Sequence, residues 1–400
     1  MPDLSFDRTI AFAQELIRIP SPPGAEKDVA ERVRMEYETL GFDDAWIDET
    51  GSAIGRIRGT GRAAPVMVSC HLDVVDIGDL DTWEYPPHGG VVADGFLHGR
   101  GAMDIKGPLA IQTYAAARFV ENRPHGDVIV AHTVLEERGG WGMERLIASG
   151  EVTPAAVIIG ESTNGDICIG HRGRAELLIE IEGVAGHASA PDRAHNPVSV
   201  LPLVLPQIER FDRTLGRDPV LGRSSLAATA IETLPTSYNV IPDIVRIVVD
   251  WRVLPGTTED DAVVQLETFL HQNVQLPEPF TLRVRFNAEH QRTWTGQERN
   301  RRMFTPGFLM AHDAPIVRAA LHAVTATTST TPAVRPWTFA TDGGHTCGIH
   351  GIPTIGYAPG EERFAHTNTE RLELESARVA WAAYPQLIAA VQNAASVAQQ

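Results

Sequence analysis

Short apolar segments that alternate with helical segments are the feature that most constrains how this chain can fold. Candidate strands lie at residues 53–58, 66–69, 127–133 and 156–159. Between and before them, apolar residues recur at helical spacing in four segments, at residues 5–18, 26–40, 108–121 and 141–149. Short apolar strands alternating with helices are typical of a parallel sheet covered on both faces. The pattern therefore predicts an α/β fold, a three-layer αβα domain with a mainly parallel sheet.

The pattern changes after Gly173, where strands with one exposed face replace the apolar ones. Strands are expected at 175–184, 225–232, 244–254 and 281–287, and helices at 197–213 and 258–273. Their order, β-α-β-β-α-β, predicts a ferredoxin-like α+β module. The first pattern resumes with a helix at 313–327, a strand at 353–357 and a helix at 374–395, whereas residues 289–311 have no clear period. We therefore expect one domain from residues 1–173 and 294–400, and an inserted domain at 174–293.

The apolar strand that begins at Val66 ends in His71, and Asp73 follows two positions later. An imidazole can bind a metal through one nitrogen while a carboxylate holds its other N–H. By itself this pair is a weak signal, because a strand-end histidine more often makes an ordinary hydrogen bond. Its weight depends on donors elsewhere in the chain.

Later segments supply the other donors of a two-metal site, namely Asp104, Glu136, Glu137, Glu161 and His366. The glutamates follow predicted strands, and open α/β sheets place their sites at such strand ends. Asp104 lies between glycines, so the backbone can bend to aim both of its oxygens at two ions. Each residue alone has an ordinary explanation, such as a helix cap or an exposed acidic pair. Their joint occurrence favours a metal site.

The donor set of three carboxylates and two imidazoles fits two divalent ions, Zn²⁺ first, with Co²⁺ or Mn²⁺ also suitable. Together with a bridging hydroxide, such a site would be close to electrically neutral. Glu136 is left over beside Glu137. It suits a general base that takes a proton from the metal-bridged water and returns it to a leaving nitrogen.

These residues and motifs resemble those of the M20 metallopeptidases, a family of co-catalytic zinc amidohydrolases and peptidases. The likeness extends from residues 16–24 to the C-terminal helix. It implies that one metal is held by His71, Asp104 and Glu161, and the other by Asp104, Glu137 and His366. It also implies that Glu136 is the general base, that Asp73 orients His71, and that the Asp104–Ile105 peptide bond is cis.

By the same resemblance, residues 1–173 and 294–400 form the metal-binding catalytic domain, and residues 174–293 form a lid and dimerisation domain. His187 matches a lid histidine that, in dimeric members, reaches the partner subunit's site and binds the carbonyl oxygen as negative charge develops. Asn239 and Arg252 match lid positions that contact substrate, and a guanidinium can clamp a carboxylate bidentately. A surface ion pair is the alternative for Arg252. The loop with Gly343 and Gly344 is expected to line the substrate pocket.

The leading functional interpretation is metal-dependent hydrolysis of an amide bond in a small carboxylate-bearing substrate. The enzyme would be an N-acyl amino acid deacylase or a dipeptidase or carboxypeptidase. An N-carbamoyl or ureido acid amidohydrolase and a catalytically inactive binding protein of the same fold are the alternatives. A serine hydrolase is disfavoured because residues 160–164 lack the last glycine of a nucleophile elbow. Cysteine catalysis is disfavoured because Cys70 and His71, as neighbours on a strand, face opposite ways.

Composition limits the partners. The formal net charge is −17, which disfavours nucleic acids and anionic membranes. The sequence contains no signal-peptide pattern and no apolar stretch of the roughly 20 residues that a membrane span needs. Its three scattered cysteines suggest reduced thiols in the cytoplasm. The expected partners are a small-molecule substrate and a second copy of the chain, bound through the inserted domain.

Overall fold

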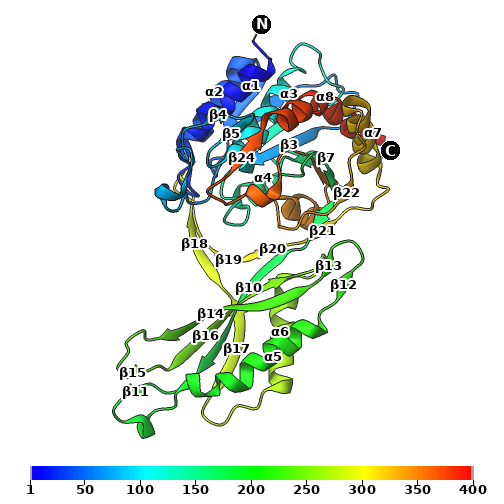
Figure 1. Cartoon of the computed structure of the whole chain (residues 1–400). Helices are drawn as coiled ribbons and strands as arrows, with labels where there is room; N and C mark the ends of the chain where they lie inside the picture. Colours follow the sequence, from blue (N-terminus) through cyan, green and yellow to red (C-terminus); the bar gives the residue numbers. More distant parts are fainter. Residues whose placement is uncertain (1, 398–400) are drawn as a thin grey trace. The chain divides into compact units, whose positions relative to one another are not determined.

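A computed structural model describes residues 2–397, and the chain divides into two compact units (Figure 1). The larger unit comprises Met1–His171, Gln291–Arg299 and Leu309–Gln400. The smaller unit comprises Arg172–His290 and Asn300–Phe308. The sequence placed the domain boundaries after residues 173 and 293. In both descriptions the middle of the chain forms a separate body.

A mixed sheet forms the centre of the larger unit, with strand order β1-β2-β6-β3-β7-β23-β8-β22. Its strands are Asp44–Ile47 (β1), Ala53–Ile57 (β2), Val66–His71 (β3), Val128–Thr133 (β6), Ala156–Ile159 (β7), Ile167–Cys168 (β8), Val334–Arg335 (β22) and Thr354–Gly356 (β23). Strand β3 pairs in parallel with β6 and β7, and β23 pairs in parallel with β7, whereas β1 and β2 are antiparallel at one edge. The predicted α/β fold with a mainly parallel sheet is confirmed.

Helices cover the central strands of this sheet. They are Phe6–Ile17 (α1), Lys27–Leu40 (α2), Gly107–Ala117 (α3), Trp141–Ser149 (α4), Pro315–Thr328 (α7) and Leu374–Val397 (α8). Helices α3 and α8 contact β3, and α2 contacts β1 and β2. Every residue of β3 and β6 is buried, so both faces of these strands are covered. Because side chains alternate along a strand, Cys70 packs in the core with α3 and His71 points to the other face.

A small antiparallel sheet brings two loops with predicted metal ligands side by side. It contains Val91–Ala93 (β4), Phe96–His98 (β5) and Arg371–Glu373 (β24) in the order β24-β5-β4. Residue Arg371 pairs with His98 in this sheet. The loop that follows β5 leads to Asp104, and the loop that precedes β24 contains His366. Pairing of β5 with β24 therefore joins segments that are remote in sequence.

The smaller unit has the predicted β-α-β-β-α-β order. Its main elements are Arg174–Glu182 (β10), Leu201–Thr214 (α5), Ser225–Leu234 (β14), Ile244–Arg252 (β16), Glu259–Asn273 (α6) and Thr281–Phe286 (β17). The antiparallel sheet has the order β14-β16-β10-β17, with Phe304–Thr305 (β20) also paired to β10. Short pairs join Gly186–His187 (β11) to Val240–Ile241 (β15) and Arg217–Asp218 (β12) to Gly222–Arg223 (β13). The ferredoxin-like prediction is confirmed.

Residues 289–311, which had no period in the sequence, contain a hairpin. Ala288–Arg292 (β18) pairs with Glu298–Arg302 (β19). The short strand Phe308–Leu309 (β21) pairs with Gly170–His171 (β9), which comes from an earlier part of the chain. Both hairpin strands are largely exposed, so they carry no apolar alternation. Between them, the Trp294 indole donates to the Gly51 carbonyl at 3.1 Å. Among residues 2–397, no helix is long and apolar enough to span a bilayer.

Candidate metal centre

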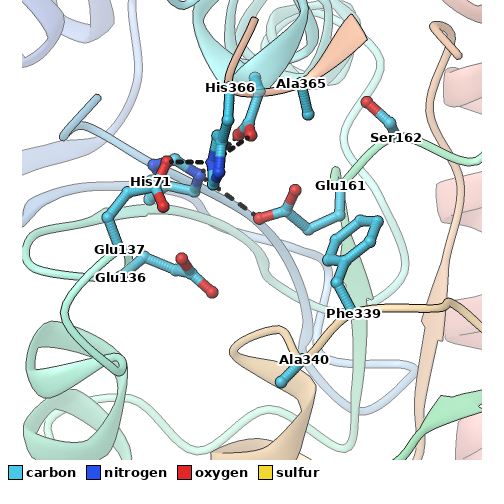
Figure 2. Close-up of a pocket in the computed structure, with 10 residues that line it drawn as sticks. His71, Glu136, Glu137, Glu161, Ser162, Phe339, Ala340, Ala365 and His366 are labelled. Atoms are coloured by element: carbon cyan, nitrogen blue, oxygen red, sulfur yellow. Dashed lines mark hydrogen bonds and ion pairs between the residues drawn. The ribbon is translucent and has the colours of Figure 1, made fainter. Parts of the chain in front are cut away.

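The glutamates and one histidine of the expected site lie at the carboxyl-terminal edge of the parallel strands (Figure 2). His71 is the last residue of β3, Glu136 and Glu137 follow β6, and Glu161 follows β7. Strands β6, β3 and β7 are neighbours in the sheet, so the segments that follow them meet at one edge. All four side chains line one pocket.

Asp104 and His366 come from irregular backbone. Asp104 lies in a short turn, Ala102–Lys106, and the Asp104–Ile105 peptide bond is cis, as the family resemblance implied. His366 follows the 3₁₀ turn Glu362–Phe364 and has a positive φ of 58°. Few non-glycine residues adopt this conformation, and they often occur where a side chain is aimed at a site.

Asp104 divides its two carboxylate oxygens between the two histidines. Its Oδ1 lies 3.1 Å from His71 Nε2, and its Oδ2 lies 3.2 Å from His366 Nε2. Glu161 Oε1 is 3.4 Å from His71 Nε2, and Glu137 Oε1 is 3.0 Å from His366 Nε2. Each imidazole therefore faces two carboxylate oxygens, and Asp104 is common to both groups. The two groups contain the same residues as the ligand sets that the family resemblance implies, and their role as metal ligands stays a prediction.

Burial and hydrogen bonds shift the pKa values of the pocket residues. Burial, followed by the charge of Asp104, raises the pKa of Glu161 to about 7. Burial also raises the pKa of Glu136 well above its ordinary value. For Asp104, burial favours the neutral acid, but hydrogen bonds with His366 and His71 outweigh it and lower the pKa. Hydrogen bonds to Asp104 and then Glu137 raise the pKa of His366 to about 10.

The donor atoms and their charge fit divalent metal ions. In each of two groups, all donor atoms lie within 4.8 Å of one another. One group contains His71, Glu136 and Glu161, and the other contains His71, Asp104 and Glu137. Carboxylate oxygens and imidazole nitrogens are ligands that Zn²⁺ accepts. Several buried carboxylates share two imidazoles, so divalent cations would offset the excess negative charge.

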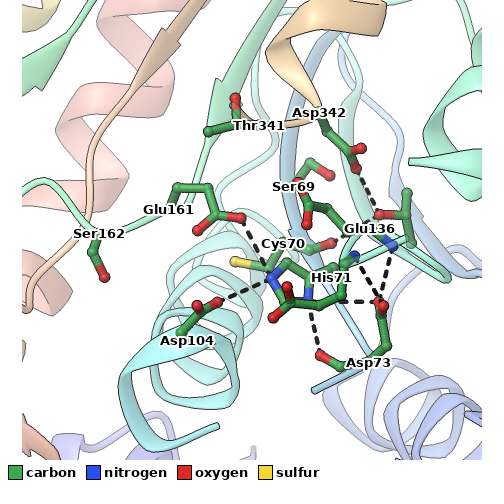
Figure 3. A network of polar contacts seen from close by, with 12 residues as sticks. Ser69, Cys70, His71, Asp73, Asp104, Glu136, Glu161, Ser162, Thr341 and Asp342 are labelled. Atoms are coloured by element: carbon green, nitrogen blue, oxygen red, sulfur yellow. Dashed lines mark hydrogen bonds and ion pairs between the residues drawn. The ribbon is translucent and has the colours of Figure 1, made fainter. Parts of the chain in front are cut away.

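The contacts of Asp73 differ from the prediction that its carboxylate holds the N–H of His71 (Figure 3). The His71 Nδ1 atom lies 2.8 Å from the main-chain carbonyl of Asp73 and 3.6 Å from its carboxylate Oδ1. The carboxylate accepts hydrogen bonds from the backbone N–H groups of Glu136 and Glu137, at 3.1 and 3.0 Å. The carbonyl thus makes the shorter contact with the imidazole, and the carboxylate fixes the loop that carries the glutamates.

The pocket has a volume of about 190 Å³ and is lined by charged and apolar side chains. The apolar part was not expected from the sequence: it consists of Phe339, Ala340 and Ala365, beside Ser162. Phe339 and Ala340 directly precede the loop, Thr341 to Gly344, that was predicted to line the pocket. This position in the sequence could have indicated that they also line it. Gly343 begins a tight turn, in which its N–H donates to Thr341 Oγ1 at 3.1 Å.

The remaining predicted residues belong to the smaller unit, where their local contacts are clear. His187 is exposed, and its Nδ1 accepts from the Ser189 backbone N–H at 3.1 Å. Asn239 Oδ1 accepts from Ser237 Oγ at 2.8 Å. Arg252 Nε donates to Asp250 Oδ1 at 2.8 Å, which is the ion pair named above as its alternative. The substrate-binding roles of all three stay predictions.

The Cys70 thiol lies on the opposite face of β3 from the His71 imidazole. Its Sγ lies 3.4 Å from Gln112 Oε1 on α3, away from the pocket face of β3. Burial raises the pKa of this thiol well above its ordinary value. Because the thiolate is the nucleophilic form, this environment argues against cysteine catalysis.

Comparison with known proteins shows which family the chain resembles. The model of peptidase family M20/M25/M40 matches residues 67–390. The uncharacterized protein YgeY of Escherichia coli K12 is 30% identical over 364 residues, which cover 90% of this chain and 88% of that protein. A succinyl-diaminopimelate desuccinylase of Cereibacter sphaeroides strain KD131 is 30% identical over 256 residues, covering 61% of this chain and 67% of the relative.

A solved structure shares the fold over nearly the whole chain. The M20 family metallo-carboxypeptidase Sso-CP2 from Sulfolobus solfataricus superimposes with a TM-score of 0.76 at 15% identity. The alignment covers 97% of this chain and 100% of that one. At this level of identity, the likeness supports the fold and leaves the substrate open.

Proposed function

Because the chain belongs to peptidase family M20/M25/M40 and is a metal-dependent hydrolase, we propose that it cleaves an amide bond in a small carboxylate-bearing substrate. The substrate would be an N-acyl amino acid or a short peptide. The desuccinylase name of one relative favours the first class, whereas the carboxypeptidase name of the structural neighbour favours the second.

The observation that carries this proposal is the shared carboxylate of Asp104. Its two oxygens face His71 and His366 separately, and each imidazole has a further carboxylate beside it. This arrangement fits one bridging ligand and two terminal ligands for each of two ions. Zn²⁺ is the ion that best suits these donors, and Co²⁺ or Mn²⁺ would also fit.

When bound, the metal supplies Lewis acidity, which lowers the pKa of water and stabilises negative charge as it develops. Glu136 would act as the general base, taking a proton from the attacking water and delivering it to the leaving nitrogen. Its position in the pocket beside the ligand glutamates supports that role. Asp73 would position Glu136 through the backbone of the same loop.

The smaller unit would bind and orient the substrate as a lid. In this proposal His187 donates to the carbonyl oxygen as negative charge develops, and Asn239 contacts the substrate. Arg252 would exchange its partner Asp250 for a substrate carboxylate, because a guanidinium binds a carboxylate in a bidentate manner. Gly343 and Gly344 would border the substrate next to Phe339.

We also propose that the chain forms a homodimer through the smaller unit and acts in the cytoplasm. Strand β14 is an edge strand whose central residues, 227–232, are exposed, including Ile231 at 49%. An exposed apolar edge strand of this length favours pairing with another chain. Light scattering after size-exclusion chromatography would detect the dimer. Its loss in an Ile231→Lys variant would assign the interface, and a wild-type monomer would exclude it.

The test of the proposed function is turnover by chelated protein before and after addition of Zn²⁺, Co²⁺ or Mn²⁺. The panel comprises N-acetyl, N-succinyl and N-carbamoyl amino acids and dipeptides, with bound metal counted by elemental analysis. We expect about two ions per chain and metal-restored cleavage of an N-acyl or peptide substrate. Cleavage of N-carbamoyl compounds alone would favour the ureido alternative. Absence of specific metal uptake would refute the site.

A further inference from the structure

A buried ion pair outside the ligand set joins the loops that carry the ligands. Arg100 and Glu370 have side chains that are only 4% and 0% exposed, and Arg100 Nη1 lies 2.7 Å from Glu370 Oε2. Neither residue belongs to the proposed ligands or to the general base. Burying two opposite charges usually costs as much as their attraction returns, so a buried pair is weak evidence for a stabilising role.

Glu370 contacts the backbone at the shared carboxylate. Its second oxygen, Oε1, accepts hydrogen bonds from the N–H groups of Met103 and Asp104, both at 3.1 Å. Charge-assisted hydrogen bonds of this kind are stronger and more directional than neutral ones. The carboxylate of Glu370 therefore fixes the main chain from which the Asp104 side chain projects.

Arg100 reaches the other two loops. Its Nη1 also donates to the Thr367 carbonyl at 3.2 Å, in the residue next to His366. Its Nη2 donates to the Asp76 carbonyl at 3.1 Å, in the loop that continues from His71 and Asp73. The rigid guanidinium thus holds two backbone segments and Glu370 at fixed spacing, which a lysine could not do in the same way.

We infer that Arg100 and Glu370 are positioning residues for the metal centre, which set the distance between His71, Asp104 and His366 without binding metal themselves. The three ligands come from loops separated by up to about three quarters of the chain, and this pair contacts all three loops. The inference rests on the proposed metal site. Outer partners of metal ligands typically contribute 10- to 100-fold in metal affinity.

Another buried carboxylate in the same unit provides a matched control. Glu36 on α2 has a side chain that is 3% exposed and is paired with Arg8 and Arg32. It also accepts a hydrogen bond from Tyr114 on α3. It resembles Glu370 in burial and in arginine pairing, but its partners lie on α1, α2 and α3. Loss of its charge should affect folding stability and leave the ligand loops unchanged.

The experiment compares the Zn²⁺ affinity and thermal stability of full-length wild type, Glu370→Gln, Arg100→Lys and Glu36→Gln, using competition with a chromophoric chelator. We expect Glu370→Gln and Arg100→Lys to weaken Zn²⁺ binding about 10- to 100-fold, with turnover recovering as Zn²⁺ is raised. Glu36→Gln should lower the melting temperature while Zn²⁺ affinity stays within about 2-fold of wild type.

The outcomes separate this inference from the proposed function. Wild-type protein without Zn²⁺ uptake would refute the metal site itself. Wild type that binds Zn²⁺, together with Glu370→Gln and Arg100→Lys variants of unchanged affinity, would refute only the positioning role. If Glu370→Gln does not fold, Arg100→Lys decides, because it keeps the positive charge and removes the fork that spans the loops.

Discussion

Glu180 of the smaller unit and Glu161 of the larger unit are both buried carboxylates, but their surroundings shift their pKa values in opposite directions. In the smaller unit, the Glu180 side chain is 1% exposed and is paired with Arg246, Arg283 and Arg285. Hydrogen bonding to Arg285 is the largest cause that lowers the pKa of Glu180, to about 2. In the larger unit, burial and the charge of Asp104 raise the pKa of Glu161 to about 7.

This difference distinguishes a structural cluster from the proposed functional one. Glu180 receives positive charge from side chains of its own sheet, so the cluster is complete without a ligand. The pocket carboxylates share two imidazoles, and a buried excess of negative charge is costly unless a cation offsets it. Fixed carboxylates that lack sufficient protein cations are typical of sites that bind metal or do chemistry.

The largest effect should come from Glu136→Gln, which tests whether the pocket carboxylates do chemistry as well as bind metal. The change removes the proton acceptor but preserves size, so we expect a loss of at least about 10²-fold in kcat. Metal content and melting temperature should stay near those of wild type. Steady-state kinetics measures kcat, elemental analysis measures bound metal, and thermal unfolding measures the melting temperature. Turnover retained in this variant would remove Glu136 from the mechanism.

His187→Ala tests whether the smaller unit is only structural. If His187 stabilises the negative charge that develops on the substrate, its loss should reduce kcat about 10²-fold, as for other donors of this kind. Bound metal should not change, because His187 is not a proposed ligand. A matched variant of the same unit, His290→Ala, should keep wild-type kinetics. Equal kinetics for His187→Ala and wild type would confine the chemistry to the larger unit.

The sequence predicted the residues of the candidate site but not the arginine cluster around Glu180. Apolar strands followed by histidine and glutamate predicted the ligands, because parallel strands bring their carboxyl ends to one edge regardless of loop detail. The same reasoning did not name Phe339, although this residue lies close to the predicted pocket loop. It could not find the Arg100–Glu370 pair, because the two residues are far apart in sequence and no local pattern distinguishes them from an ordinary ion pair.

Neutralising Glu180 and neutralising Glu161 should change the stability of the fold in opposite directions. In metal-free protein at pH 7.5, Glu180→Gln should destabilise the fold by about 1–3 kcal/mol, because it removes charge-assisted hydrogen bonds. Glu161→Gln should stabilise it by about 1 kcal/mol, because it removes a charge that is unfavourable through burial and then through repulsion with Asp104. Denaturant unfolding of both variants gives the two signs. Destabilisation of equal size in both would contradict the proposed charge imbalance.

The smallest effect is a pH dependence whose direction differs between the clusters. The depressed pKa of Glu180 stabilises the fold above the ordinary glutamate value near 4.5, and this contribution is lost as the pH falls toward about 2. The raised pKa of Glu161 has the opposite sign: metal-free protein should lose stability as the pH rises from about 4.5 to about 7.

Unfolding of chelated wild type, Glu161→Gln and Glu180→Gln across this range measures both contributions. The difference between wild type and Glu180→Gln should shrink at pH 3. The difference between wild type and Glu161→Gln should shrink at pH 4.5. A difference that is independent of pH in either pair would mean that the carboxylate acts through packing and not through its charge.

The sequence by itself determined the two folds and the chemical identity of the proposed ligands, because periodicity and strand-end residues are local properties. Only the tertiary structure decided how those ligands are held. It assigned the His71 N–H contact to the main-chain carbonyl of Asp73, and it gave the Asp73 carboxylate to the glutamate loop. It also brought Arg100 and Glu370 together across the chain. Such contacts depend on loop conformation and long-range packing, which no local pattern of residues specifies.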